Sequence, residues 1–172
     1  MTCGFVHIYT GAGKGKTTAA LGLLLRAVGA GLRVYLGQFL KGRVTSELRM
    51  LQTRFPEVTV EQFGRPEFVI TAPSAEDVDA AHQALQRFRQ AMLSGLYDVL
   101  IADEIMVAIK LGLISVEDVV ALLAEKPAAV ELVLTGRDAP ATLVELADVV
   151  TDMRCIKHYF DRGVAARPGI EF

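Results

Sequence analysis

A turn rich in glycine and lysine, residues 10–18, constrains this chain more than any other feature. It reads Thr-Gly-Ala-Gly-Lys-Gly-Lys-Thr-Thr and lies between a short apolar run and a segment rich in alanine and leucine. Because its three glycines lack Cβ atoms, backbone N–H groups can turn inward around phosphate oxygens, and the following helix would point its positive dipole end at them. Lys16 adds a mobile positive charge, and the Thr17 hydroxyl could reach a magnesium ion that bridges two phosphates. The turn therefore predicts a phosphate-binding loop.

The spacing of this turn favours a nucleotide triphosphate as the ligand. Against the pattern G-x-x-x-x-G-K-[ST], Gly15, Lys16 and Thr17 match, whereas Thr10 takes the place of the first glycine. A dinucleotide-binding Rossmann fold fits worse, because Lys16 stands where the third glycine of its motif belongs. The second expected strand also ends in the amide Gln38 rather than in an acid.

The rest of the chain alternates between two hydrophobic patterns. Runs typical of strands and segments typical of helices follow each other, with strands expected at 5–9, 33–39, 58–63, 97–102 and 130–135, and helices at 16–30, 45–54, 75–94, 115–124 and 140–147. This alternation predicts an α/β fold with a mainly parallel central sheet and helices on both faces. One domain suffices for 172 residues, and a hydrophobic content of 52% fits a sheet covered on both sides.

The end of the chain has a different character. Residues 155–172 show neither a helical nor a strand period, yet they contain aromatic residues, charges and glycines. Such a tail usually frays, but this composition could also fold back over a ligand. We therefore divide the chain into an α/β domain, residues 1–154, and a C-terminal tail, residues 155–172, which we expect to fold back over the site.

Charged side chains follow two of the expected strands. Asp103 and Glu104 end an apolar strand, and ligands of doubly wound sheets bind beyond the carboxyl ends of the strands. Two acids there could hold Mg²⁺ or Mn²⁺; in an ATPase the second acid commonly activates water, whereas in a transferase it can simply hold the metal. Arg137 closes the next strand and could bind phosphate. Arg26, in the helix after the loop, could contact the ligand or pair with a carboxylate.

Composition argues against several classes of protein. A net charge of −2 and an isoelectric point near 5.9 disfavour nonspecific binding to nucleic acid. No apolar stretch reaches membrane-spanning length and no charged leader precedes the first strand, so we expect a cytoplasmic protein with no membrane partner. Cys3 and Cys155 have no metal-ligand spacing, and the three histidines have none either.

These residues together resemble the P-loop type of corrinoid adenosyltransferase, a family that transfers the 5′-deoxyadenosyl group of ATP to cobalt(I) of a cobalamin or its precursor. The resemblance covers nearly the whole chain and includes the phosphate loop with its displaced first glycine, residues 38–42 and the acid pair. The most distinctive matches lie near the end, at Thr135-Gly-Arg137, Ala147-Asp-Val-Val-Thr-Asp-Met153, Lys157-His158, Phe160-Asp161, Gly163-Val164 and Gly169-Ile170-Glu171.

The resemblance implies a P-loop NTPase-like (RecA-like) domain with ATP as co-substrate and a corrinoid as substrate. Lys16 and Thr17 would act on the triphosphate, and Thr17 and Glu104, with Asp103, would hold the metal. Cobalt(I) is already a powerful nucleophile, so the protein needs no general base and has to supply in-line positioning and charge stabilisation. The residues expected to bind the nucleotide are Gly11, Ala12, Gly13, Lys14, Gly15, Lys16, Thr17, Thr18, Arg26 and Arg137.

One departure from the family concerns the corrinoid. The family has a Phe-x-Trp pair after the third strand, which is thought to exclude the lower axial ligand and so to make cobalt easier to reduce. The matching residues here are Phe68 and Ile70, and the chain contains no tryptophan. We expect Phe68 to act in catalysis and both residues to contact the corrinoid. Because Ile70 keeps an apolar wedge but loses area and stacking, we also expect a different corrinoid preference or reduction step.

Two other functions are open at this point. Glu104 could polarise water in an ATP-hydrolysing P-loop protein of another class, or the chain could deliver finished adenosylcorrinoid without making it. The products separate these hypotheses, because transfer yields intact triphosphate whereas hydrolysis yields ADP and orthophosphate. The resemblance further implies a homodimer and a cellular reductant such as a flavoprotein.

Overall fold

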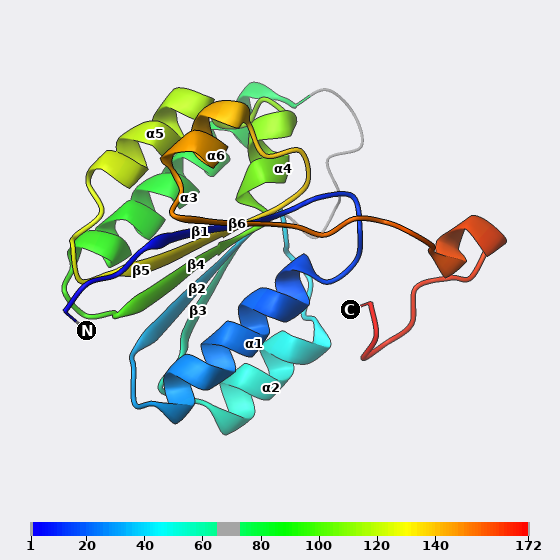
Figure 1. Ribbon diagram of the computed structural model, residues 1–172, viewed down its shortest axis with the longest axis horizontal. Helices are drawn as coiled ribbons and strands as arrows, with labels where there is room; N and C mark the ends of the chain where they lie inside the picture. Colours follow the sequence, from blue (N-terminus) through cyan, green and yellow to red (C-terminus); the bar gives the residue numbers. More distant parts are fainter. Residues whose placement is uncertain (1, 65–72, 172) are drawn as a thin grey trace.

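The computed structural model describes residues 2–64 and 73–171 and is built on a parallel sheet (Figure 1). Its six strands have the spatial order β3-β2-β4-β5-β1-β6, and every neighbouring pair is parallel. The strands are β1 (Val6–Thr10), β2 (Val34–Phe39), β3 (Thr59–Phe63), β4 (Val99–Asp103), β5 (Glu131–Thr135) and β6 (Val149–Asp152). This arrangement confirms the predicted α/β fold with a parallel sheet.

Helices cover both faces of the sheet (Figure 1). On one face lie α1 (Lys16–Gly29) and α2 (Ser46–Arg54); on the other lie α3 (Ala75–Leu93), α4 (Ile105–Lys110), α5 (Val116–Ala124) and α6 (Ala141–Leu146). Each face has its own apolar cluster, one with Leu24 and Leu51, the other with Phe88, Met92 and Leu143. The core therefore consists of two layers separated by the sheet, as the composition predicts.

Local sequence explains where helices α3 and α5 begin. Ser74 and Ser115 each cap a helix by accepting from the backbone N–H three residues later, while the aspartate at that position accepts from the serine backbone. These two reciprocal capping boxes satisfy N–H groups that have no partner inside the helix. On α3, Phe88 and Met92 belong to the stripe that faces the sheet, and both are buried.

Two elements of the α/β domain are absent from the sequence-based prediction. Strand β6 forms the edge of the sheet beside β1; all four of its residues are exposed, and only the first two, Val149 and Val150, are apolar. Helix α4 begins directly after Glu104 and has only six residues, so it is too short to show a helical repeat in the sequence.

The tail leaves the sheet at the end of β6 and returns toward the phosphate loop (Figure 1). It contains one short 3-10 helix, η1 (Tyr159–Arg162), and the Lys14 ammonium donates to the carbonyl oxygen of Ile170 at 2.6 Å. None of the helices in residues 2–64 and 73–171 has the length and apolarity that crossing a membrane requires. Phe68 and Ile70 lie outside the described residues.

Candidate active site

A cavity of about 550 Å³ opens at the carboxyl ends of the strands. Its walls come from the phosphate loop and the first turn of α1, from the loop after β2 and the start of α2, from the ends of β4 and β5, and from the tail. The side chains that meet there include Lys16, Thr17, Glu104 and Arg137. Eight of the predicted site residues, from three separate parts of the sequence, thus line one cavity: Gly13, Lys14, Gly15, Lys16, Thr17, Thr18, Glu104 and Arg137.

The side chain of Lys16 folds back across the phosphate loop. Its ammonium donates to the carbonyl oxygens of Gly11 and Gly13, both at 2.7 Å, and only 7% of the residue is exposed. Burial lowers the pKa of Lys16, and the nearby Arg137 lowers it further. The lysine therefore holds the loop in shape and places a positive charge at the wall of the cavity.

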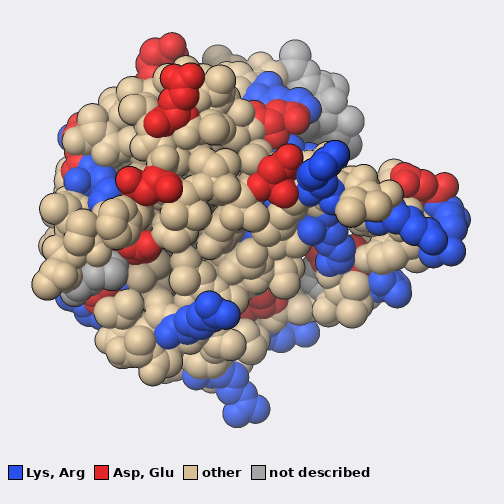
Figure 2. Space-filling model, viewed as in Figure 1, with Lys and Arg blue, Asp and Glu red and all other residues tan. Residues whose placement is uncertain are grey.

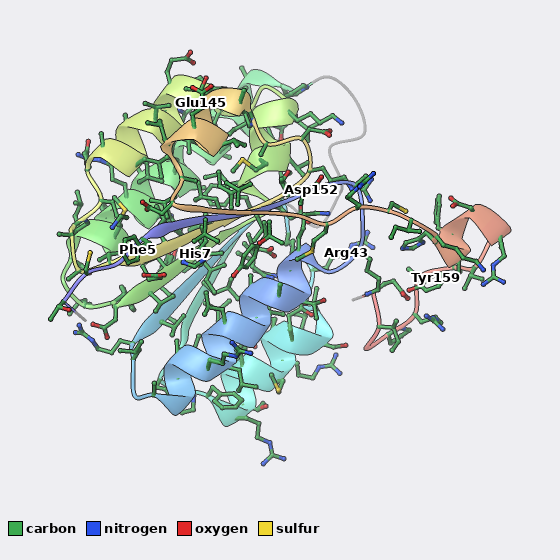
Figure 3. The ribbon with its side chains drawn as sticks, in the orientation of Figure 1. Phe5, His7, Arg43, Glu145, Asp152 and Tyr159 are labelled. Carbon is green, nitrogen blue, oxygen red and sulfur yellow. The ribbon has the colours of Figure 1, made fainter. Side chains whose placement is uncertain are left out.

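The phosphate loop rests against the chain that follows β6. The Gly13 N–H donates to the Met153 carbonyl oxygen at 2.6 Å, and the Met153 N–H donates to the Thr10 carbonyl oxygen at 2.9 Å. A Cβ atom on Gly13 would lie 2.5 Å from the Met153 carbonyl oxygen, so no larger residue fits without a backbone shift. Residues 152–154 thus act as a backing for the loop, and Asp152 lies at the point where β6 reaches it (Figure 3).

Asp103 is the centre of a buried hydrogen-bond network beneath the cavity. Its Oδ1 accepts from the hydroxyls of Thr17 at 2.9 Å and Thr135 at 2.7 Å. Its Oδ2 accepts from the ammonium of Lys41 at 2.7 Å and, more weakly, from the amide of Gln38 at 3.4 Å. Asp103 is completely buried, and with four donors its carboxylate is held in one orientation.

Glu104 follows Asp103 but faces the cavity itself. Its backbone is left-handed, with φ of 63°, and its N–H donates to the Thr135 hydroxyl at 2.9 Å. Burial raises the pKa of the Glu104 carboxyl, and the neighbouring Asp103 raises it further. A left-handed non-glycine backbone is unfavourable and is typical of functional sites.

The oxygen atoms at this place suit a hard cation. The Thr17 hydroxyl gives its hydrogen to Asp103, so its lone pairs are free to face the cavity, which Glu104 also lines. Asp103, in contrast, has both oxygens engaged by other side chains. Across residues 2–64 and 73–171, no three His, Cys, Asp or Glu side chains form a metal-binding group of their own.

Three residues that were predicted to contact a ligand do not line the cavity as the structure describes it: Arg26, Phe68 and Ile70. Arg26 lies in the last turn of α1, exposed, and a helix rises about 1.5 Å per residue, which puts it roughly 15 Å beyond Lys16. The structure therefore does not bring Arg26 to the cavity. For Phe68 and Ile70, which are outside the described ranges, contact with a corrinoid stays a prediction.

Other contributors were missed at the sequence level. Lys41, Gln38 and Thr135 all belong to the Asp103 network, and all lie at or just after the carboxyl ends of β2 and β5. A usable signal existed, because Gln38 and Thr135 are polar residues in otherwise apolar strands. Residues 152–154 gave no such signal, since their role is made by backbone atoms.

The tail adds charge and cover at the mouth of the cavity. His158 and residues 169–171 line it, and Glu171 is held by the Tyr159 hydroxyl and by the Arg167 backbone N–H. The hydrogen bond from Tyr159 lowers the pKa of Glu171 to about 2. Figure 2 shows Lys and Arg side chains gathered where the tail meets the body, and the tail itself contains Lys157, Arg162 and Arg167.

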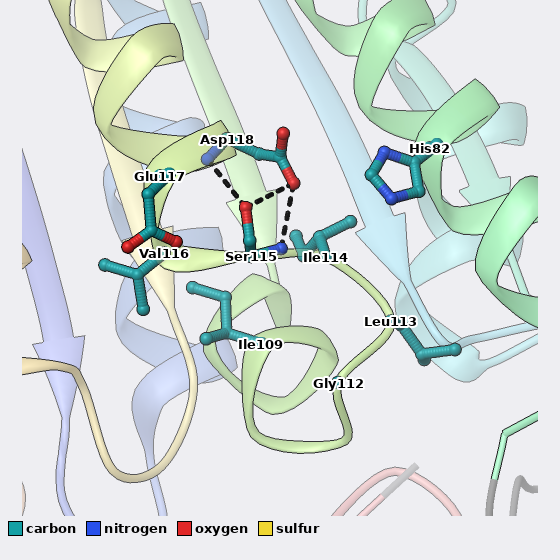
Figure 4. Close-up of a pocket in the computed structure, with 9 residues that line it drawn as sticks. All are labelled: His82, Ile109, Gly112, Leu113, Ile114, Ser115, Val116, Glu117 and Asp118. Carbon is teal, nitrogen blue, oxygen red and sulfur yellow. Dashed lines mark hydrogen bonds between the residues drawn. The ribbon is translucent and has the colours of Figure 1, made fainter.

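A second hollow, of about 540 Å³, lies between α3, α4 and α5 and shares no residue with the first (Figure 4). Its main polar groups, Ser115 and Asp118, bond to each other in the capping box of α5. Glu117 and His82 are the other polar side chains of its wall, and the rest of the wall is apolar. We assign these polar groups to helix capping rather than to ligand binding.

Comparison with known proteins agrees with this geometry. Residues 2–172 match the family model described as ATP:corrinoid adenosyltransferase BtuR/CobO/CobP. A corrinoid adenosyltransferase of Sinorhizobium sp is 36% identical over 174 residues, which cover 98% of this chain and 80% of that protein. The corrinoid adenosyltransferase of Escherichia coli K12 is 34% identical over 98% of this chain and 86% of that protein. The corrinoid adenosyltransferase of Pseudomonas aeruginosa is 33% identical over 98% of this chain and 84% of that protein. The chain therefore belongs to the ATP:corrinoid adenosyltransferase family.

Proposed function

We propose that the cavity binds ATP with its triphosphate in the phosphate loop and its 5′ carbon open to the cobalt of a corrinoid. The adenosyl group then moves to the cobalt, and triphosphate leaves intact. The observation that carries the proposal is the convergence of Lys16, Thr17, Glu104 and Arg137 on one cavity at the carboxyl edge of the sheet. Cations and oriented N–H groups at this place suit a polyanionic leaving group.

The chemical step needs positioning more than proton transfer. The electron pair of cobalt(I) in the substrate forms a bond to the ribose 5′ carbon while the bond from that carbon to the triphosphate oxygen breaks. The bonding pair leaves with the triphosphate, so no proton has to move. The chain has to align the two reactants and stabilise the growing negative charge, for which Lys16, Arg137 and the loop N–H groups are placed.

Thr17 and Glu104 are the residues we propose as ligands of Mg²⁺ or Mn²⁺. When bound, the cation would neutralise phosphate charge and so ease departure of the triphosphate. Asp103 lies one layer below and accepts the Thr17 hydrogen, which fits a supporting role better than direct ligation.

The tail, residues 155–172, is proposed as a cover over the nucleotide and corrinoid. Support comes from the Lys14 contact to Ile170 and from the tail residues that line the cavity. A cover excludes water, which strengthens electrostatic interactions inside the site. The proposal also includes a homodimer, a cellular reductant such as a flavoprotein, and the cytoplasm as the compartment where ATP and that reductant meet.

An anaerobic assay with ATP, Mg²⁺ and chemically reduced cobalamin tests the proposed reaction. We expect the cobalt spectrum to change to that of an alkylated corrinoid while one triphosphate appears per corrinoid. ADP and orthophosphate with an unalkylated corrinoid would identify a hydrolase instead. Tight binding of adenosylcobalamin without turnover would identify a delivery protein.

Phe68 is proposed to assist the reduction of cobalt, as the family resemblance implies. Phe68→Ala should slow the reaction that starts from cobalt(II) about 10-fold or more, because one aromatic wedge against the corrin is lost. The reaction that starts from pre-reduced cobalt(I) should change far less. Equal losses in the two assays would count against a role in reduction.

A further inference from the structure

We infer that Lys41 is a positioning residue for the cation site and that it acts through Asp103 on the hydroxyl of Thr17. The inference rests on the proposed function, because it concerns the cation that accompanies ATP. It assigns a role to a side chain that neither the motif of the phosphate loop nor the acid pair includes.

The first argument is charge. The Lys41 ammonium lies 2.7 Å from Asp103 Oδ2, and its other acidic neighbour, Glu47, is at 3.8 Å. Asp103 is completely buried, whereas the Lys41 side chain keeps 24% of its surface exposed. A buried carboxylate is costly unless a cation and hydrogen bonds compensate it, and Lys41 is the cation that contacts this one. Burial lowers the pKa of Lys41, but the charge and hydrogen bond of Asp103, together with the charges of Glu47 and Glu104, outweigh burial, and the pKa is raised.

The second argument is backbone geometry. Leu40, directly before Lys41, has a left-handed backbone with φ of 61°. The turn is locked from β3, since the Gly64 N–H donates to the Lys41 carbonyl oxygen at 3.0 Å and a Cβ on Gly64 would lie 2.4 Å from the Leu40 carbonyl carbon. Such a backbone is unfavourable for a residue other than glycine and persists only where the surroundings impose it. The fold maintains this strained turn at the place from which Lys41 reaches Asp103.

The third argument is the path from Lys41 to the cavity. Lys41 and Gln38 fix one oxygen of Asp103, and this sets the direction of the other oxygen, which accepts from Thr17. Without Lys41, the first oxygen would keep only the long contact of 3.4 Å to Gln38. The carboxylate could then rotate, and the Thr17 hydroxyl would lose its fixed direction. Residues that orient a metal ligand in this way typically change metal affinity about 10- to 100-fold when removed.

Isothermal titration calorimetry with ATP, without corrinoid, tests this role. Each variant is titrated once in MgCl₂ and once in EDTA, so that the contribution of the cation is separated from that of the phosphates. Lys41→Met should weaken ATP affinity in MgCl₂ about 10- to 100-fold and in EDTA less than about 3-fold. Lys110→Met is the matched control: its ammonium also pairs with an aspartate, Asp138 at 2.6 Å, but both side chains are exposed, and we expect no change in either medium.

A double-mutant cycle tests whether the effect passes through Asp103. In an Asp103→Asn background, Lys41→Met should weaken Mg²⁺-dependent affinity by less than about 2-fold, because coupled residues are not additive. Equal losses in MgCl₂ and EDTA would mean that Lys41 binds phosphate directly, and additive losses would mean that it acts independently of Asp103; either overturns the inference. If Lys41→Met does not fold, Lys41→Gln is judged by the same ratio of affinities.

The same titrations separate this inference from the proposed function. A parent protein whose ATP affinity does not depend on Mg²⁺ would contradict both. A parent protein with a strong Mg²⁺ dependence that Lys41→Met leaves unchanged would contradict only the role of Lys41.

Discussion

The amino and carboxyl edges of the sheet contain nearly the same interactions, yet these interactions have different roles. At the amino edge, Arg33 and Asp98 join the starts of β2 and β4; at the carboxyl edge, Lys41 and Asp103 join the ends of the same strands. Each edge also has a lysine whose ammonium donates to loop carbonyl oxygens, Lys126 at the first and Lys16 at the second.

Burial and backbone strain distinguish the two edges. Arg33 and Asp98 keep 54% and 20% of their side-chain surface exposed, whereas Asp103 keeps none. Among the described residues, the non-glycine residues with a left-handed backbone are Leu40, Glu104 and Asp138, and all of them follow the carboxyl ends of strands. The presence of an ion pair therefore does not distinguish the functional edge from the other edge. Burial and strain together mark the edge where chemistry is expected.

Replacing each of the two lysines gives the largest expected contrast. Lys16→Ala should lower adenosyl transfer about 100- to 1,000-fold, because a cation beside the leaving group is lost. Loss of its two hydrogen bonds to loop carbonyl oxygens should lower the free energy of unfolding by about 1 to 3 kcal/mol and leave the protein folded. Anaerobic turnover and urea unfolding measure the two quantities. A Lys16→Ala protein that does not fold would contradict the assignment of this side chain to ligand rather than to core.

Lys126→Ala is the counterpart at the amino edge. Its ammonium donates to the carbonyl oxygens of Gly4, Pro127 and Val130, so its removal should lower the free energy of unfolding by about 1 to 3 kcal/mol. We expect kcat to be unchanged. A large loss of activity in the folded variant would break the distinction between the two edges.

Two glycine-to-alanine variants test the comparison through backbone contacts rather than side chains. Gly13→Ala would place a Cβ 2.5 Å and 2.8 Å from the carbonyl oxygens of Met153 and Arg154, so the loop has to shift. A misplaced loop should weaken ATP affinity about 10- to 100-fold in a calorimetric titration. Gly22→Ala, in α1 with open space around it, should leave affinity unchanged and stabilise the protein by about 1 kcal/mol. Equal affinities for the two variants would refute the backing role of residues 152–154.

The Arg33–Asp98 pair should give a smaller effect that depends on pH. Hydrogen bonds from Arg33 lower the pKa of Asp98 to about 2, below its ordinary value of 3.8. The pair therefore stabilises the protein above about pH 4, and this contribution is lost as the pH falls through about 2. Because solvent screens the pair, Asp98→Asn should cost about 1 kcal/mol at pH 7.

Urea unfolding at pH 7, 4 and 2.5 checks this prediction. The difference between parent and Asp98→Asn should shrink as the pH is lowered. Asp79→Asn, which removes an exposed acid on α3, controls for the change in net charge. A difference that grows toward acid would contradict the sign of the effect.

The sequence predicted the parts of this molecule that depend on local pattern. The five apolar strands, the capped helices α3 and α5, and the phosphate loop were all identified because each repeats apolar residues or groups glycines. Edge strand β6 was not, since its exposed residues lack that pattern. Asp103 and Glu104 were expected at the carboxyl edge, where the structure places them.

The relation between distant segments could not be predicted in the same way. Whether Lys41 pairs with Asp103 depends on the left-handed turn at Leu40, which no propensity of leucine suggests. The contact between Gly13 and Met153 depends on backbone atoms, which every residue has. Arg26 shows the converse, because its place in α1 was known but the rise of the helix carries it away from the cavity.

The backing of the phosphate loop by residues 152–154 has a consequence for biosynthesis. The loop, residues 10–18, is translated long before residues 152–154, which support it. A nascent polypeptide should therefore expose a glycine-rich turn that is not yet able to retain ATP. We expect nucleotide to be retained only after residues 152–154 have left the ribosome and packed against the loop.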